Sequence, residues 1–257
     1  MIKEETRFCE STVFEGMTSI RAIIKAIDEG STERRLISVL YDKDKKQKNI
    51  KTIGYLKAVS QKYGFSVEET TSEDIEKLTV GNSHGGIIAV AGNRELPFIS
   101  HDTSLPASGF FAMIEGIEDP YNFGYALRSL YACGCDGIIL TERNWMSAAG
   151  VVCRSSAGAS ELFAMYKATD AAEAVLEFKR RGYTVVCAHE DTNEILGKCE
   201  LKKPILLIVG GEKRGISEKI TELADIKVKI DYAREFSASL SAASATTMFG
   251  YEIMRQN

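Results

Sequence analysis

Three separate segments of the chain combine polar side chains with small residues, as a site that binds a polar ligand closely would require. The first, EDPYNFGYALR, carries Asn122, Gly124 and Arg128 around the expected start of a helix. The second, GGEKRGIS, carries Glu212, and the third, DYAREFSASLSAASA, carries Ser239. Amide, guanidinium, carboxylate and hydroxyl groups can together orient a substrate through hydrogen bonds. The same residues could instead form a helix cap, a tight turn and a charged surface, and the segments alone leave both interpretations open.

The paired glycines of the second segment do not belong to a phosphate-binding loop of either common type. A P-loop requires the pattern GxxxxGK[ST], and Lys213 is misplaced for it. A dinucleotide-binding loop requires GxGxxG after the first strand of a βαβ unit, which this segment lacks. Gly210 and Gly211 instead predict that the backbone approaches another group closely, and that group need not be a phosphate.

The three segments follow apolar runs that we expect to be strands. FFAMIEGI precedes the first segment, PILLIV the second and IKVKI the third. Ligands of open α/β sheets bind beyond the carboxyl ends of the strands, so the three segments could converge on one edge of a sheet. We expect Asn122 to cap the helix after the first strand, a short helix at 215–223, and the last helix at 239–255.

The rest of the chain also alternates short apolar runs with helical patterns, and we find no internal repeat. This alternation predicts an α/β fold with a mostly parallel sheet that is covered on both faces. The segment NRELPFISHDTSLPASG interrupts the pattern with two of the four prolines. We therefore expect a small α/β domain at 1–95, a linker at 96–108 and a second α/β domain at 109–257.

The composition is that of an ordinary globular chain of 257 residues, with 44% hydrophobic and 26% charged residues. No run is long enough for a membrane span and no signal peptide is recognisable, so we expect a cytoplasmic protein. The histidines do not cluster with the cysteines, and no cysteine pair has the usual zinc spacing, so we expect no metal. We interpret all six cysteines as reduced and structural: Cys9, Cys133, Cys135, Cys153, Cys187 and Cys199.

The net charge of −4 argues mildly against a protein that coats nucleic acid without specificity. A local basic patch is still compatible with that charge. The run DKDKKQKNIK brings together five lysines, Lys43, Lys45, Lys46, Lys48 and Lys51. On its own, such a run is more often a solvated loop than a binding surface.

Taken together, the three segments resemble the three motifs of the SpoU (TrmH-like) RNA ribose methyltransferases of the SPOUT superfamily. The order and spacing match over most of residues 110–257. DPYNFGYALR resembles motif 1, LLIVGGEKRGIS resembles motif 2, and KIDYAREFSASLSAASATTMFGYE resembles motif 3. CRSSAGA, at 153–159, resembles the Ser-Ala-Gly-Ala segment between motifs 1 and 2. More loosely, STVFEGMTSIRAIIKAIDEG and HGGIIAV resemble the start and end of a small substrate-binding domain.

The resemblance implies an activity, a cofactor and partners. It implies an α/β domain with a deep trefoil knot near its C-terminus, S-adenosyl-L-methionine as cofactor, and a homodimer. The reaction would methylate a ribose 2′-hydroxyl of RNA, with rRNA favoured over tRNA because the extra N-terminal domain is commoner among rRNA-directed relatives. The small domain would hold RNA, which gives Lys45, Lys46 and Lys48 a role in substrate binding.

The resemblance also assigns roles to individual residues. Arg128 would orient the 2′-hydroxyl and its phosphate, and Asn122 would position Arg128 or the ribose. Glu212 would hold the motif 2 loop or a group of the partner subunit, and Ser239 would line the site. The backbones of three further residues would contact the cofactor: Gly210, Ile230 and Leu240.

The chain departs from the family pattern at one position of motif 3. The family usually has Ser-Leu-Asn where this chain has Ser239, Leu240 and Ser241. This departure keeps a second hypothesis open, a catalytically silent relative that binds RNA or assists ribosome assembly. A third hypothesis, an unrelated nucleotide-dependent α/β enzyme, is disfavoured because both nucleotide-binding loops are missing.

Overall fold

The computed structural model describes residues 13–80, 84–141 and 148–257, and these form two compact units. Unit 1 contains the described residues up to Glu95 together with the described segment 148–162. Unit 2 contains the described residues from Leu96 up to that segment and from Phe163 to Asn257. The expected domains at 1–95 and 109–257 follow chain order, whereas these contacts place the segment ending at Leu162 with unit 1. The division into separately folding domains stays a prediction.

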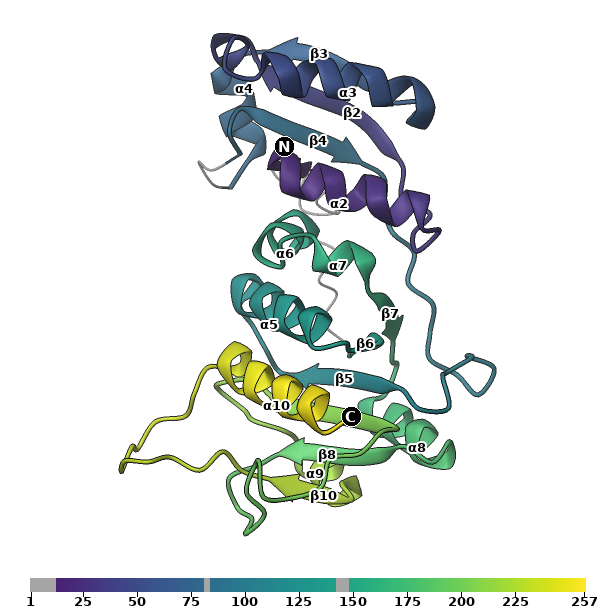
Figure 1. Ribbon diagram of the computed structural model, residues 1–257, viewed down its shortest axis with the longest axis vertical. Helices are drawn as coiled ribbons and strands as arrows, with labels where there is room; N and C mark the ends of the chain where they lie inside the picture. The colour runs from purple at the N-terminus through teal and green to yellow at the C-terminus, as the bar shows by residue number, and fades with distance from the viewer. Residues whose placement is uncertain (1–12, 81–83, 142–147) are drawn as a thin grey trace, which may run out of the picture. The chain divides into compact units, whose positions relative to one another are not determined.

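Unit 1 is built on a four-stranded mixed sheet in the order β1-β4-β2-β3 (Figure 1). β2 pairs in parallel with β3 and antiparallel with β4, and β4 pairs antiparallel with β1. The strands are β1 (Val13–Glu15), β2 (Leu36–Asp42), β3 (Ser66–Thr70) and β4 (Ile87–Ala91). The helices are α2 (Gly16–Asp28), η1 (Lys43–Lys45), α3 (Ile50–Tyr63), α4 (Ser72–Leu78), α6 (Ala149–Ser155) and α7 (Ala159–Leu162).

The helices α6 and α7 were not expected from the sequence, and they pack against α2 and β1 of unit 1. Gly158, between them, has a φ of +90°, and a methyl group there would collide with Ala22 of α2. A buried ion pair adds to this contact, because Arg34 Nε lies 3.0 Å from Glu161 Oε2. Arg94 Nη1 also donates to the Ser160 carbonyl at 2.7 Å. The CRSSAGA segment therefore forms the close joint between α6 and α7 on α2.

Unit 2 is built on a six-stranded sheet in the order β10-β8-β9-β5-β6-β7, in which every neighbouring pair is parallel. This confirms the expected α/β class and the parallel sheet. The strands are β5 (Phe110–Glu115), β6 (Gly137–Leu140), β7 (Ala164–Lys167), β8 (Thr184–Ala188), β9 (Ile205–Gly210) and β10 (Ile226–Val228). The helices are α5 (Pro120–Ala132), α8 (Ala171–Arg180), α9 (Glu218–Leu223) and α10 (Ala242–Gln256).

The central strands β5 and β9 are apolar up to the last residue of each, because helices cover both faces of the sheet. Phe111 and Met113 of β5 pack with Phe178 of α8 and Ile220 of α9 in one buried cluster. On the other face α10 packs against β9 and lies alongside α5 (Figure 1). The edge strand β7 was not expected, and the last helix begins at Ala242 instead of residue 239.

The five cysteines of the described ranges are free, and Cys9 lies outside those ranges. Burial raises the pKa of Cys133, Cys135 and Cys153, and it raises the pKa of Cys187 to about 12. These thiols are therefore protonated near neutral pH and are poor nucleophiles. Within the described ranges, no group of three or more His, Cys, Asp or Glu side chains could hold a metal ion. No helix there combines the length and apolar character of a membrane span.

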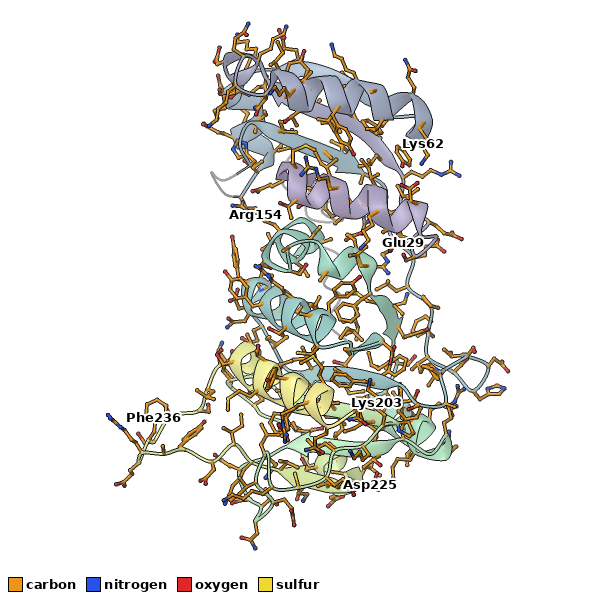
Figure 2. All side chains as sticks on the ribbon, viewed as in Figure 1. Glu29, Lys62, Arg154, Lys203, Asp225 and Phe236 are labelled. Carbon is orange, nitrogen blue, oxygen red and sulfur yellow. The ribbon has the colours of Figure 1, made fainter. Side chains whose placement is uncertain are left out.

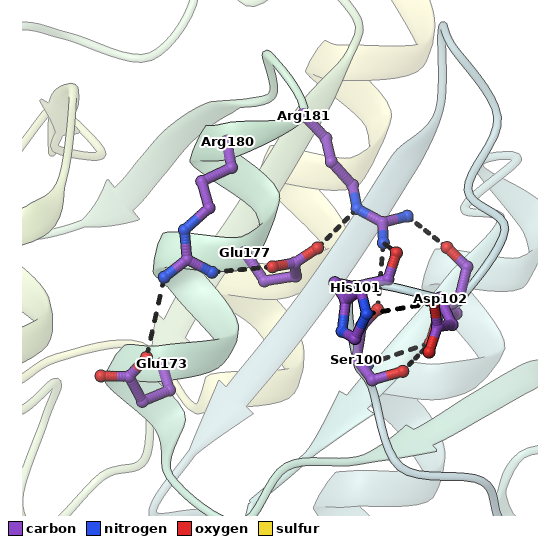
Figure 3. Close-up of polar contacts among 8 residues, drawn as sticks. Ser100, His101, Asp102, Glu173, Glu177, Arg180 and Arg181 are labelled. Carbon is purple, nitrogen blue, oxygen red and sulfur yellow. Dashed lines mark hydrogen bonds and ion pairs between the residues drawn. The ribbon is translucent and has the colours of Figure 1, made fainter.

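The segment expected to be a linker, 96–108, lies against unit 2 through directed hydrogen bonds. Arg181, which follows α8, donates from Nη2 to the carbonyls of Ser100 at 3.0 Å and His101 at 2.6 Å. Its Nη1 donates to the Thr103 carbonyl, and its Nε donates to Glu177 Oε1 at 2.8 Å (Figure 3). Tyr183 adds a hydrogen bond of 2.6 Å to the Pro106 carbonyl. One guanidinium fork thus fixes the turn at 100–103.

Replacing Arg181 with alanine should lower the free energy of unfolding by about 2 kcal/mol, because charge-assisted bonds to three carbonyls are removed. Arg180→Ala is the matched control, since the Arg180 side chain is 62% exposed and its partners among the residues described are two glutamates, Glu173 and Glu177 (Figure 3). It should change stability by less than about 0.5 kcal/mol. Urea unfolding of both variants measures the difference. Equal effects would show that the turn at 100–103 does not depend on Arg181.

Candidate functional site

The three sequence segments follow β5, β9 and β10, as expected, and all three belong to unit 2. β5 and β9 are neighbours in the parallel sheet, and the register pairs Glu115 with Gly210 at their carboxyl ends. The first two segments therefore start side by side. The third returns from the edge strand β10 to the start of α10, which packs on β9.

Glu212 joins the three segments through one carboxylate oxygen. Its Oε1 accepts a hydrogen bond from Asn122 Nδ2 at 3.1 Å and another from the backbone amide of Ala242 at 3.1 Å. Asn122 belongs to α5, and Ala242 is the first residue of α10. The first and second segments are also joined by an ion pair, in which Lys213 Nζ lies 2.7 Å from Glu118 Oε2. Two predicted site residues, Asn122 and Glu212, are therefore in direct contact.

The cap of α5 is Asp119, so the expectation that Asn122 caps this helix was wrong. The Asp119 carboxylate accepts from the amides of Tyr121 and Asn122, both at 3.2 Å, and Pro120 occupies the first turn. Aspartate followed by proline is a typical helix start, since proline has no amide to leave unpaired. Because Asp119 serves as the cap, the Asn122 side chain is available to donate to Glu212.

The cap of α10 is Ser241, the residue at which the chain departs from the family pattern. Its Oγ accepts from the Ser244 amide at 3.2 Å. Serine and asparagine are about equally effective helix caps, so the substitution preserves this local interaction. Ser239 lies before the helix, in the segment 231–241, and not at its first turn as expected. The carboxylate of Glu212 lies at the amino end of α10, where the helix dipole favours a negative charge.

The two glycines of the second segment approach other parts of the backbone. A methyl group on Gly210 would lie 2.7 Å from the Gly215 Cα, and one on Gly211 would lie 2.7 Å from the Ile117 amide nitrogen. The loop closes on itself, since the Gly215 amide donates to the Gly211 carbonyl at 3.0 Å. The close approach predicted from the sequence is thus satisfied by the protein's own first and second segments.

A cavity of about 900 Å³ lies beside this junction. Its wall includes Gly210, Glu212, Ile230, Ser239 and Leu240, five of the predicted site residues. The same wall also includes residues at and after the end of β8 and three residues of α10: Ala188, His189, Glu190, Ala242, Ala245 and Phe249. The volume is typical of a pocket for a small organic ligand.

Two features of this wall bear on ligand binding. The amide and carbonyl of Ile230 make no hydrogen bond to any residue that the structure describes, so both are available to an occupant. The Leu240 amide instead donates to Tyr232 Oη at 3.2 Å, which ties the two ends of the segment 231–241 together. Figure 2 shows Phe236 at the outer tip of that segment. Tyr232 was missed by sequence reasoning, which gave no signal for this contact.

Arg128 lies on α5 outside the wall of the cavity. Its side chain is exposed, and its guanidinium makes no hydrogen bond or ion pair with the described part of the chain. Tyr121 and Tyr125, four residues apart, are exposed on the same helix. At this spacing, both tyrosines share one helical face with Arg128. The donor fork of Arg128 is therefore free to bind a group from outside the chain.

The lysines predicted to bind substrate belong to unit 1, and two of them have carboxylate partners. Lys45 Nζ lies 3.4 Å from Asp42 Oδ2, and Lys46 Nζ lies 2.6 Å from Glu69 Oε2. The hydrogen bond to Glu69 raises the pKa of Lys46. Lys48 is exposed and has no partner among the residues described, so it is the lysine of the three that is most available to a phosphate.

Comparisons with known proteins agree with the family resemblance. A model described as the SpoU rRNA methylase family matches residues 109–251. The 23S rRNA (guanosine-2′-O-)-methyltransferase RlmB of Shewanella oneidensis is 26% identical over 200 residues, which is 76% of this chain and 80% of that protein. YacO of Bacillus subtilis, a proposed TrmH family tRNA/rRNA methyltransferase, is 26% identical over 77% of this chain and 80% of its own length.

Solved structures show the same fold. An AdoMet-bound rRNA methyltransferase from Sinorhizobium meliloti superposes with a TM-score of 0.76 at 22% identity, covering 98% of this chain and 89% of that one. The SpoU methyltransferase AviRb from Streptomyces viridochromogenes, in complex with AdoMet, gives a TM-score of 0.73 at 20% identity, covering 95% and 89%.

Replacing Glu212 with alanine should loosen the amino end of α10, because the Ala242 amide loses its acceptor. We expect faster hydrogen exchange at that amide, by about tenfold, for the removal of one charge-assisted hydrogen bond. Glu212→Gln keeps an acceptor oxygen and should exchange more slowly than Glu212→Ala. Lys213→Ala, which removes a neighbouring exposed ion pair, is the control. Unchanged exchange in Glu212→Ala would mean that Glu212 does not hold the three segments together.

Proposed function

Since the chain belongs to the SpoU rRNA methylase family, we propose that it transfers a methyl group from S-adenosyl-L-methionine to a ribose 2′-hydroxyl of RNA. The observation that carries this proposal is the Glu212 junction, which brings the family's three motif segments together beside one cavity. The ribose specificity and the preference for rRNA over tRNA are supported by the RlmB relative, which acts on 23S rRNA. We also propose that the protein is cytoplasmic, since its proposed substrate is RNA.

The cavity fits the proposed cofactor in size and in the groups that it offers. Ile230 presents an amide and a carbonyl that have no partner in the described part of the chain, and these suit the donor and acceptor edge of an adenine. Gly210 and Leu240 complete this contact surface through their backbones, and the Tyr232 hydroxyl holds Leu240 in place. When bound, S-adenosyl-L-methionine supplies a methyl group activated by its sulfonium.

Arg128 would act on the RNA. A guanidinium stays protonated in proteins and is a poor base, so its contribution is orientation through its fixed fork. It would hold the phosphate next to the target ribose and present the 2′-hydroxyl to the cofactor side. The hydroxyl oxygen must lie in line with the transferred carbon and the sulfur, and holding that alignment lowers the barrier by several kcal/mol. The hydroxyl proton would leave to the substrate phosphate or to water.

The other predicted residues would support this arrangement. Asn122 and Glu212 fix the start of α5 relative to the cavity, because their side chains are hydrogen-bonded to each other. Ser239 would line the site with a hydroxyl that can donate and accept. Since Ser241 provides a cap to α10, its departure from the family pattern gives no structural reason to favour the catalytically silent alternative.

We also infer that the protein is a homodimer and that its C-terminal segment is knotted. Exposed apolar side chains gather on α5 and α10, two helices that pack together: Tyr121, Tyr125, Met248, Tyr251 and Met254. Such a surface favours an interface with a second copy. The knot is supported by the return of the chain from the edge strand β10 to the middle of the sheet. Only the family relationship outweighs the general rarity of knots.

Replacing Arg128 with alanine should reduce kcat for RNA methylation by at least about 100-fold, as expected when a positioning group is removed. The affinity for S-adenosyl-L-methionine should stay within about twofold, because Arg128 does not line the cavity. The assay uses methyl-labelled cofactor and unmethylated rRNA, and resistance of the labelled site to alkali identifies ribose methylation. Arg180→Ala is the surface control. Normal turnover by Arg128→Ala would remove Arg128 from the mechanism.

Replacing Lys45, Lys46 and Lys48 with alanine should weaken RNA binding and flatten its dependence on salt. The slope of log K against log salt changes by about 0.7 to 0.9 for each phosphate that the protein no longer neutralises. Lys48→Ala alone should account for most of the change, because Lys45 and Lys46 already have carboxylate partners. Lys57→Ala, an exposed lysine of α3, is the matched control. Filter binding at several salt concentrations measures the slope, and an unchanged slope would make this run an ordinary solvated loop.

A further inference from the structure

Unit 1 contains a second cavity, of about 370 Å³, that the proposed methyl transfer does not use. It lies at the amino end of α2, and its wall includes Met17, Thr18, Asn49, His84 and Arg154. The volume lies within the range of about 300–1,000 Å³ that is typical of sites for small ligands. All of these residues belong to unit 1, so the cavity is complete within that unit.

His84 lies on this wall with one ring nitrogen committed and the other available. The residue is only 6% exposed. Its Nδ1 accepts a hydrogen bond from the Gly86 amide at 3.1 Å, and its carbonyl accepts from the Ile87 amide at 3.2 Å, so the turn fixes the ring. Nε2 has no partner among the residues described, and it is not one of the fully enclosed unpaired atoms. It is therefore the polar atom that His84 presents to an occupant of the cavity.

The ring of His84 is a donor at this position. Burial is the main cause that lowers the pKa of His84; the positive charges of Lys45 and Arg154 also lower it, while Glu15 and Asp42 oppose the shift. The ring is therefore neutral near pH 7. A neutral imidazole whose Nδ1 accepts a hydrogen bond carries its proton on Nε2.

The start of α2 offers further donors to the same space. Its cap residue, Glu15, makes no capping bond through its side chain, and the first turn holds no acidic residue. The first amides of a helix have no partner within the helix, so Met17 and Thr18 leave theirs directed out of its amino end, where the dipole favours an anion. Glu15 also lines the cavity, but its Oε1 accepts from the Val80 amide at 2.9 Å and its Oε2 is paired with Arg154.

Arg154 (labelled in Figure 2) reaches this site from α6 and keeps part of its donor fork free. Its Nη1 pairs with Glu15, while Nε and Nη2 have no partner in the part of the chain that the structure describes. Asn49 belongs to the lysine-rich segment 43–51 and lines the cavity, and its Nδ2 donates to the Gly85 carbonyl at 3.0 Å. The cavity therefore opens next to the exposed basic segment 43–51.

We propose that this cavity binds a backbone phosphate of the RNA substrate, with His84 Nε2, the first amides of α2 and Arg154 as donors. The proposal rests on the proposed function in one respect, that the ligand is RNA. A phosphate suits the site because three sources of free donors meet there, the His84 ring, the first amides of α2 and the Arg154 guanidinium, while Glu15 is paired with Arg154. Phosphate binding at the amino end of a helix is a recurrent arrangement in proteins. The adjacent Lys48 would bind a neighbouring phosphate of the same strand.

The direct test observes the His84 ring nitrogens by NMR in the full-length protein labelled with ¹⁵N-histidine. The three ligands to be added are inorganic phosphate, a short single-stranded oligouridine, and an abasic ribose-phosphate oligomer of the same length. We expect both oligomers to shift the Nε2 resonance of His84 at concentrations at which inorganic phosphate has no effect. A shift caused equally well by inorganic phosphate would overturn RNA as the occupant. No shift with any ligand, or a shift with oligouridine but not with the abasic oligomer, would overturn the phosphate site.

The functional test compares two substitutions of His84. His84→Phe removes the donor and should weaken RNA binding about tenfold, the effect of one well-placed hydrogen bond. His84→Gln retains an N–H donor and should stay within about threefold. The affinity for S-adenosyl-L-methionine should be unchanged in both variants, because His84 does not line the larger cavity of unit 2. His101→Phe, at an exposed histidine of unit 2, is the control. Equal RNA binding by His84→Phe and wild type would overturn the proposal.

This design separates the inference from the proposed function. RNA binding and the NMR titration do not require methyl transfer, so a protein that methylates no RNA could still confirm the phosphate site. Conversely, methylation with unchanged affinity in His84→Phe would leave the enzyme proposal intact and remove the cavity from it. Thermal unfolding of each variant establishes that the substitution has not disrupted unit 1.

Discussion

One carboxylate oxygen of Glu212 accepts from a side chain on α5 and from the backbone at the start of α10, and the geometry of the candidate site depends on it. These partners are 90 and 30 residues away along the chain. Glu212 is exposed, so the net free energy that these bonds contribute is small. The two hydrogen bonds matter because they are directional. The two donors fix the orientation of the Glu212 carboxylate, and this orientation fixes the loop that carries Glu212.

The glycines of the same loop explain why hydrogen bonds of small net free energy are sufficient to hold the loop in one conformation. Gly210 and Gly211 already bring the loop against its own return and against the end of β5, and neither approach leaves room for a side chain. Steric contact therefore restricts the loop to few conformations before any hydrogen bond forms. Glu212 selects among those conformations by pairing with α5 and α10. Tyr232 restrains the segment 231–241 in the same way, through one hydroxyl.

The sequence predicted the fold of unit 2 well where burial alone determines it. The runs in β5 and β9 are apolar up to the last residue of each strand because both faces of the sheet are covered, and such runs are recognisable from the sequence alone. The helices α6 and α7 were missed because their small and polar residues give no clear period. Their helical state depends on packing against α2, more than a hundred residues earlier in the chain. The short edge strand β7 has too few residues to show a pattern.

The motif order predicted which segments meet at the candidate site, but not which of their atoms are hydrogen-bonded to one another. Asp119 and Asn122 are both good helix caps, and only the structure decides that the aspartate has this role. In the same way, Ser241 caps α10 while Ser239 lies in the preceding segment. A sequence pattern gives the types and order of donors and acceptors. Which donor pairs with which acceptor depends on the residue at which each helix begins, and a shift of that start by one residue changes the pairs.

The joint formed by α6 and α7 has a consequence for the order in which the protein can be made. The chain passes from unit 1 into unit 2, returns to unit 1 for these two helices, and then completes unit 2. Arg34 is buried beside Glu161, so its charge has no carboxylate partner there until 127 further residues have left the ribosome. A buried charge without its partner is strongly destabilising. The described core of unit 1 is therefore complete only after this segment has been made, and a fragment cut after residue 95 would lack Ala149 and Cys153 of that core.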